Sequence, residues 1–153
     1  MKIKNYFLPL CLKNRNKTMN ILADANVYLA ILLNEPEKQH IIKMTKGAEL
    51  ISPEVLPFEI GNALSAMFKQ KRLSKEQVHR CFEIFEFIPV RLEYVDITSA
   101  LAIACRFNIY AYDAYYLTLA QRLNLPLLTL DKKMQDVAKQ MNLKLLEVYN
   151  ENV

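Results

Sequence analysis

Two short apolar runs that each stop at an aspartate constrain the fold of this chain more than any other feature. Residues 20–23 end at Asp24 and residues 127–130 end at Asp131, and a helical pattern follows each acid. Apolar runs of this length are typical of strands that are buried on both faces, as in parallel sheets. Both aspartates would then lie at the carboxyl edge of the sheet, where open α/β folds bind their ligands.

The rest of the chain alternates between strand-like and helix-like patterns. This alternation favours right-handed crossovers and a mostly parallel sheet of about five strands, covered by helices on both faces. Ser52 is expected to cap the helix that follows the second strand, and Pro57 is tolerable there only in an early turn or at a kink. The further strands are predicted over 49–52, within 88–95 and over 144–148, and helices over 27–33, 36–46, 53–70, 74–87, 98–107, 114–123 and 132–141.

Composition excludes several kinds of site. With 153 residues the chain is long enough for one domain, and its 2 glycines rule out the glycine-rich phosphate loops. The 3 cysteines and 2 histidines are scattered, which argues against a disulfide framework, a zinc site or a Cys-His or Ser-His-Asp nucleophile. We therefore expect buried thiols and a cytoplasmic location, and any metal should be held by oxygen, which favours Mg²⁺ or Mn²⁺.

The net charge of +4 comes from the start of the chain. Residues 1–18 contain five basic residues and no acid, and the remainder has 15 basic against 16 acidic residues. This leader has the features of a secretory signal, of a basic arm for a polyanion, or of an extension upstream of Met19. We favour the extension, which leaves a domain over 19–150. No other segment reaches the ~18 apolar residues of a membrane span.

Acidic residues are the strongest candidates for chemistry. Asp24, Asp113 and Asp131 each stand where a helix is expected to begin, and N-capping is the commoner role of a single such aspartate. Glu59 lies within a predicted helix beside an apolar stripe and has no basic residue one turn away, although Asn62 could hydrogen-bond it. If the four acids converge, their repulsion raises their pKa values, and a divalent cation would remove that penalty.

Four segments resemble, in order, the motifs of the PIN domain, and within it those of the VapC toxin nucleases of VapBC toxin–antitoxin pairs. They are residues 20–27, 54–64, 111–120 and 128–134. The resemblance implies a three-layer α/β/α sandwich that uses Mg²⁺ or Mn²⁺ to hydrolyse RNA phosphodiester bonds.

The resemblance also implies roles for individual residues. Asp24, Glu59, Asp113 and Asp131 are the expected catalytic acids, and Asp24 and Asp113 are the expected direct metal ligands. Hydrogen bonds to these acids are expected from Asn26, Thr129 and Asn62. Two basic clusters could contact RNA phosphates but are more typical of solvated surface; they are Lys132 with Lys133, and Lys69 with Lys71 and Arg72. Most of Tyr110, Tyr112, Tyr115 and Tyr116 should pack into the core, although such rings could stack on bases.

Partners follow from the same resemblance. The chain is expected to form a homodimer and to be silenced by a small VapB-like antitoxin. Tyr28, Leu32 and Ile41 would supply the docking groove if they are exposed. The alternatives are a housekeeping PIN nuclease in RNA processing and a catalytically silent PIN scaffold, and the intact set of acids argues against the scaffold.

Overall fold

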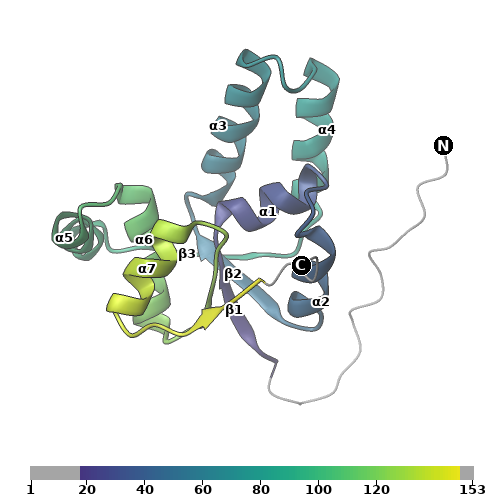
Figure 1. Ribbon diagram of the computed structural model, residues 1–153. Helices are drawn as coiled ribbons and strands as arrows, with labels where there is room; N and C mark the ends of the chain where they lie inside the picture. Colours follow the sequence, from purple (N-terminus) through teal and green to yellow (C-terminus); the bar gives the residue numbers. More distant parts are fainter. Residues whose placement is uncertain (1–17, 149–153) are drawn as a thin grey trace.

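A five-stranded sheet forms the centre of the protein (Figure 1). The computed structural model describes residues 18–148, and all strand pairings in this part of the chain are parallel, in the order β3-β2-β1-β4-β5. The predicted parallel α/β architecture is confirmed. The strands are β1 (Asn20–Ala23), β2 (Glu49–Pro53), β3 (Arg91–Glu93), β4 (Leu127–Leu128) and β5 (Leu145–Leu146).

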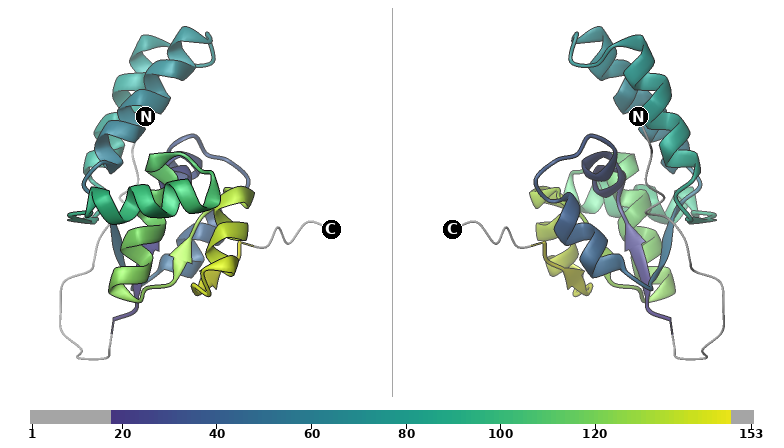
Figure 2. Two further views of the ribbon diagram at one scale, coloured as in Figure 1. Left: turned by 90° about the vertical axis from the view of Figure 1, so that its left-hand side faces the viewer. Right: turned by 90° about the vertical axis from the view of Figure 1, so that its right-hand side faces the viewer.

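The helices form two groups that cover opposite faces of the sheet. In one group α1 packs on α2, α3 and α4, and in the other α6 packs on α5 and α7 (Figure 1). The α3–α4 hairpin projects well beyond the rest of the molecule (Figure 2). The helices are α1 (Ala25–Leu32), α2 (Lys38–Thr45), α3 (Leu56–Lys69), α4 (Lys75–Glu86), α5 (Ile97–Phe107), α6 (Ala111–Leu123) and α7 (Lys132–Gln140).

The central strands are buried on both faces. Ile21, Leu22 and Ala23 of β1 and both residues of β4 have no exposed surface. Because consecutive side chains of a strand point to opposite faces, a strand without polar alternation must be covered on both sides. β1 and β4 pair directly, with Ala23 opposite Leu128, so the residues that follow both strands emerge side by side.

Several helix starts differ from the predicted ones, and two of the differences change the position of an acid within its helix. α3 begins at Leu56 because β2 continues to Pro53, so Pro57 lies in the first turn and Glu59 is also a first-turn residue. α6 begins at Ala111, with Tyr110 as its N-cap, so Asp113 lies inside the helix rather than capping it.

Ser52 lies in the sheet and does not cap α3. Its hydroxyl is fully buried, donates to the carbonyl of Ala23 at 2.6 Å and lies 3.0 Å from the hydroxyl of Tyr28. This contact fixes the main chain directly before Asp24. The hydroxyl of Ser52 satisfies two polar groups in the core, and these groups would lose their partner if Ser52 capped α3 instead.

Replacing Ser52 with alanine should therefore lower the free energy of unfolding by about 1–3 kcal/mol, because two buried oxygens lose their partner. Urea denaturation measures this change. Ser65→Ala is the matched control, since Ser65 is exposed and bonds only the carbonyl of Asn62, and its effect should stay within about 0.5 kcal/mol. Equal effects of the two substitutions would contradict the assignment.

The burial of individual side chains corrects other expectations. Tyr28 and Ile41 are fully buried, because they pack α1 and α2 into the core, and so they cannot line a docking groove; Leu32 is partly buried. Of the two described cysteines, Cys81 is buried but Cys105 is exposed.

Among residues 18–148, no helix combines the length and apolarity that a bilayer crossing requires. The predicted leader lies outside the described residues, apart from Thr18.

Candidate active site

The fold carries the predicted acids to the carboxyl edge of the central strands. Asp24 directly follows β1, and Asp131 lies three residues after the end of β4. Glu59 and Asp113 come from the first turns of α3 and α6. The acids are electrostatic neighbours: Asp24 and Asp113 both act on Glu59, Asp113 acts on Asp24, and Asp131 acts on Asp113.

Asp24 is the most buried of these acids, with 3% of its surface exposed. Thr129 Oγ1 donates to its Oδ2 at 2.6 Å, and the main-chain and side-chain nitrogens of Asn26 each lie 3.3 Å from its carboxylate. Burial raises the pKa of Asp24, and the hydrogen bonds from Thr129 and Asn26 oppose that rise. The carboxylate is thus held in one orientation by donors, without a basic partner among the groups that shift its pKa.

Thr129 connects two of the acids. Its hydroxyl donates to Asp24 and accepts the main-chain N–H of Asp131 at 3.0 Å. The sheet makes this link possible, because the N–H of Asp24 bonds the carbonyl of Leu128 at 3.1 Å and brings the end of β4 beside it. Residues 105 positions apart in the sequence are therefore neighbours in the site.

Glu59 is held by a tyrosine from α6. The hydroxyl of Tyr116, which is almost fully buried, donates to Glu59 Oε2 at 2.6 Å. Burial raises the pKa of Glu59 to about 7 with the help of Asp24 and Asp113, against the opposing hydrogen bond from Tyr116. Burial and the same glutamate raise the pKa of Tyr116, which therefore stays a donor.

Tyr116 is a site residue that the sequence did not single out. The partner expected for Glu59 was Asn62, but Asn62 is exposed, and no hydrogen bond joins it to Glu59 among the described residues. A buried tyrosine hydroxyl requires a partner. That rule indicates that Tyr116 bonds something, but its partner lies 57 residues earlier in the chain and cannot be identified from local spacing.

Asp113 and Asp131 differ in their local roles. Asp131 is the N-cap of α7, and its Oδ1 accepts the N–H of Met134 at 2.8 Å. Asp113 makes no capping bond within residues 18–148 and is half-buried. Burial and the charge of Asp131 raise the pKa of Asp113, and Lys133 lowers it. Capping therefore accounts for Asp131 in part, but it does not account for Asp113.

The two lysines after Asp131 are placed differently from each other. Lys133 extends its ammonium group to the carbonyl of Asn108 at 3.1 Å, at the C-terminal end of α5. Lys132 is exposed at the start of α7. The contact of the two lysines with RNA stays a prediction.

The donor set suits a hard divalent cation. Asp24, Glu59 and Asp113 all have raised pKa values, and Lys133 is the one basic group that contributes to them. Clustered carboxylates of this kind are stabilised by Mg²⁺ or Mn²⁺, which prefer oxygen ligands. Among residues 18–148 no three acidic, imidazole or thiol groups lie close enough to form a finished metal cage, although the acids are near enough to shift one another's pKa values.

Comparisons with known proteins agree with this geometry. Ribonuclease VapC9 of Mycobacterium tuberculosis is 29% identical over 120 residues, which cover 78% of this chain and 91% of that protein. A crystal structure of PAE2754 from Pyrobaculum aerophilum superposes with a TM-score of 0.61 at 22% identity and covers 78% of this chain and 86% of that one. A structure of VapBC-1 from nontypeable Haemophilus influenzae gives 0.58 at 17% identity and covers 84% and 98%.

The family model described as the PIN domain matches residues 21–140, which run from β1 to the end of α7. The matched stretch contains all four acids together with Thr129 and Tyr116. The match covers most of the chain and agrees with the order of the sheet and with acids at the carboxyl ends of β1 and β4. The chain therefore belongs to the PIN-domain family.

Proposed function

We propose that this protein is a VapC-like toxin, a Mg²⁺- or Mn²⁺-dependent endoribonuclease that hydrolyses RNA phosphodiester bonds. The observation that carries the proposal is the convergence of Asp24, Glu59 and Asp113 at one sheet edge with raised pKa values. The similarity to proteins named VapC ribonucleases supports the choice of RNA as substrate.

In this proposal Asp24 and Asp113 hold the cation, and Glu59 and Asp131 complete the acidic site. When bound, the metal ion polarises the scissile phosphate and neutralises developing negative charge. Thr129 and Asn26 keep the Asp24 carboxylate facing the site, so that no free energy is spent on orienting it during the reaction.

Glu59 is suited to accept a proton from the attacking water. Its Oε2 accepts a hydrogen bond from the hydroxyl of Tyr116, whereas Oε1 accepts none within residues 18–148. A carboxylate with a pKa of about 7 is well matched to proton transfer near neutral pH. Tyr116 fixes the side chain so that Oε1 stays directed away from the tyrosine.

Partners are part of the same proposal. Solved structures of similar fold include VapBC2 from Rickettsia felis and VapBC-1, which supports a VapB-like antitoxin as the regulator of this chain in the cytoplasm. A homodimer is proposed on family grounds. The domain is proposed to comprise residues 19–150, preceded by an extension over 1–18.

A direct test is to incubate the purified protein with single-stranded RNA and Mn²⁺ and to map the new RNA ends by sequencing. We expect internal cuts that require the metal ion, that disappear when EDTA is added, and that return when Mn²⁺ is supplied in excess. Cleavage that is unaffected by EDTA would contradict the metal mechanism, and complete inactivity of the Mn²⁺-loaded protein on RNA would overturn the proposal.

A further inference from the structure

A cavity of about 350 Å³ has none of the four acids in its wall and is not used by the proposed chemistry. Its volume is at the small end of the ~300–1,000 Å³ that small-molecule sites occupy. Aromatic rings and one carboxylate dominate its wall. The wall residues on which the argument rests are Glu54, Phe58, Tyr94, Ile97, Tyr112 and Tyr115; we call this site the aromatic cavity.

The rings of the aromatic cavity are unusually exposed. Phe58 is 76% exposed, Tyr94 61% and Tyr112 52%. Ile97, on the same wall, is 53% exposed. A contiguous group of large apolar side chains on the surface of a water-soluble domain is characteristic of a binding site. The sequence analysis expected most of these tyrosines in the core, but of Tyr110, Tyr112, Tyr115 and Tyr116 only Tyr116 is buried there.

The aromatic cavity lies at the same edge of the sheet as the acidic site. Its wall includes the residues that follow β2 and β3, whereas Asp24 and Asp131 follow β1 and β4, so both lie at the carboxyl edge of one parallel sheet. Neighbouring strands are about 4.8 Å apart. In addition, Phe58 and Tyr112 are the immediate chain neighbours of Glu59 and Asp113. A strand of RNA laid along this edge would pass from the acids to the aromatic cavity.

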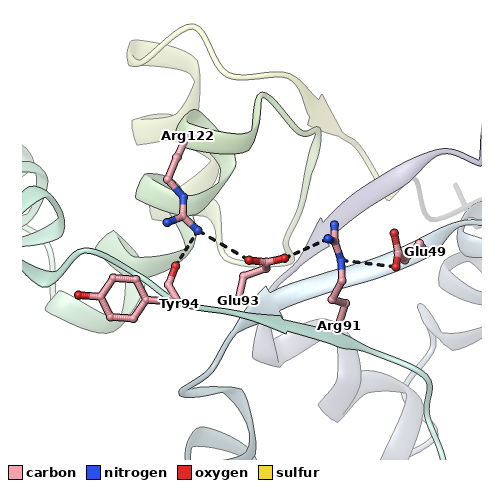
Figure 3. Close-up of polar contacts among 5 residues, drawn as sticks. All are labelled: Glu49, Arg91, Glu93, Tyr94 and Arg122. Carbon is pink, nitrogen blue, oxygen red and sulfur yellow. Dashed lines mark hydrogen bonds and ion pairs between the residues drawn. The ribbon is translucent and has the colours of Figure 1, made fainter.

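In one wall of the aromatic cavity, a hydrogen bond holds the main chain of Tyr94 in place. Figure 3 shows Arg122 of α6 donating to the main-chain carbonyl of Tyr94 at 2.7 Å, while the tyrosine ring extends away from the guanidinium group. Arg122 also lies 3.9 Å from Glu93, and Glu93 pairs with Arg91 at 3.0 Å. On another wall the rings of Tyr112 and Tyr115 meet edge to face, with centroids 5.7 Å apart. The main chain of Tyr94 and the ring pair of Tyr112 and Tyr115 are therefore held in place before any ligand arrives.

We propose that the aromatic cavity holds one unpaired base of the RNA substrate, close to the phosphate that is cut. The inference rests on the proposed ribonuclease function and deepens it. Phe58 and the tyrosine rings supply faces for stacking, which any base can use. The carboxylate of Glu54 can accept a hydrogen bond from an exocyclic amino group, so bases with an amino group should be preferred.

A second copy of this chain is the rival occupant, because a large aromatic patch also suits a protein interface. Glu54 favours the base: charged residues are depleted at the centre of protein interfaces, and this carboxylate shares the cavity wall with Phe58 and Tyr94. The position of the cavity at the same sheet edge as the acids favours the base as well, since a nucleic acid held at the acids must continue past it.

The test uses the Mn²⁺-loaded full chain and a set of single-stranded RNAs that are cut at one mapped phosphate, each with one abasic nucleotide at a successive position. For the wild type, kcat/KM should fall roughly 5- to 100-fold at one abasic position within about two nucleotides of the cut, as expected for the loss of one stacked base. Phe58→Ala should lose a similar factor on intact RNA and should lose little more at that abasic position, because both changes remove the same contact.

Phe68→Ala is the matched control, because Phe68 is 50% exposed on the same helix but lies at its far end. It should cleave intact and abasic RNA as the wild type does. If the wild type cuts all abasic RNAs as fast as intact RNA, the base-binding inference is overturned while the ribonuclease function stands. If Phe58→Ala changes the mass measured by light scattering and slows all RNAs equally, the aromatic cavity belongs to an interface between copies. A wild type that cleaves no RNA overturns the proposed function itself.

Discussion

Asp24→Asn and Asp113→Asn are each expected to lower kcat/KM for Mn²⁺-dependent RNA cleavage by roughly 100-fold or more. Each substitution replaces a proposed metal ligand that carries a negative charge with a neutral amide of the same shape. A metal ion contributes several kcal/mol of charge stabilisation, and each 1.36 kcal/mol corresponds to a factor of ten in rate. Initial rates on one RNA, measured over a range of Mn²⁺ concentrations, provide the test.

The fold should survive both substitutions. Burial already disfavours the charged form of Asp24, and an amide oxygen can still accept the hydrogen bond from Thr129. Without metal, Asp24→Asn should therefore remain folded, because relief of the buried charge offsets the loss of the hydrogen bond from the Asn26 main-chain N–H, which the amide nitrogen cannot accept. Asp136→Asn is the control, because Asp136 is an exposed acid of α7, and its activity should be unchanged. Full cleavage by both site variants would remove the basis for the assigned site.

Stability of the metal-free protein should fall as the pH rises from about 5.5 to 8. The pKa of Glu59 is 4.5 in its ordinary state and about 7 in the fold, so the folded protein retains a proton that the unfolded chain has lost. The stabilising contribution is complete below pH 4.5 and is lost as the pH passes 7. The full shift corresponds to about 3 kcal/mol, which solvent around this partly exposed carboxylate reduces to roughly 1–2 kcal/mol.

Glu59→Gln isolates this effect, because glutamine keeps an acceptor for Tyr116 but cannot titrate. Urea denaturation of both proteins in EDTA at pH 5.5 and pH 8 gives the difference between their pH dependences. Excess Mn²⁺ should raise the free energy of unfolding of the wild type at pH 8, by about 2.7 kcal/mol when the metal concentration is 100 times Kd. Identical pH dependence of wild type and Glu59→Gln would show that Glu59 is not perturbed by its neighbours.

Local pattern was sufficient for the elements and for the identity of most acids. The apolar runs before Asp24 and Asp131 are buried parallel strands, because only a strand covered on both faces lacks polar alternation. Helix starts were less reliable. Ser52 and Asp113 have the residue types of N-caps, but pairing of β2 with its neighbours recruits Ser52, and α6 extends upstream of Asp113 to Tyr110.

Burial of individual aromatic side chains was the weakest part of the prediction. Tyr28 was offered as a docking residue and is fully buried. Most of Tyr110, Tyr112, Tyr115 and Tyr116 were expected in the core, but Tyr110 is 81% and Tyr112 52% exposed. A helix that covers a sheet beside a binding edge has one face toward the sheet and one toward solvent. The sequence can make these two faces equally apolar. Which face turns inward is decided by packing against distant elements, and no pattern within the helix records it.

The sequence by itself determined the class of fold, because strand periodicity is a local property, and residue chemistry predicted the acids and the kind of cation that they would suit. Only the tertiary structure decided the partners of those acids. Thr129 reaches Asp24 through the pairing of β1 with β4, Tyr116 of α6 reaches Glu59 in the first turn of α3, and the aromatic cavity opens where β2 and β3 end. The physical reason is that each of these contacts joins residues that are remote along the chain, and their encounter depends on how the layers pack.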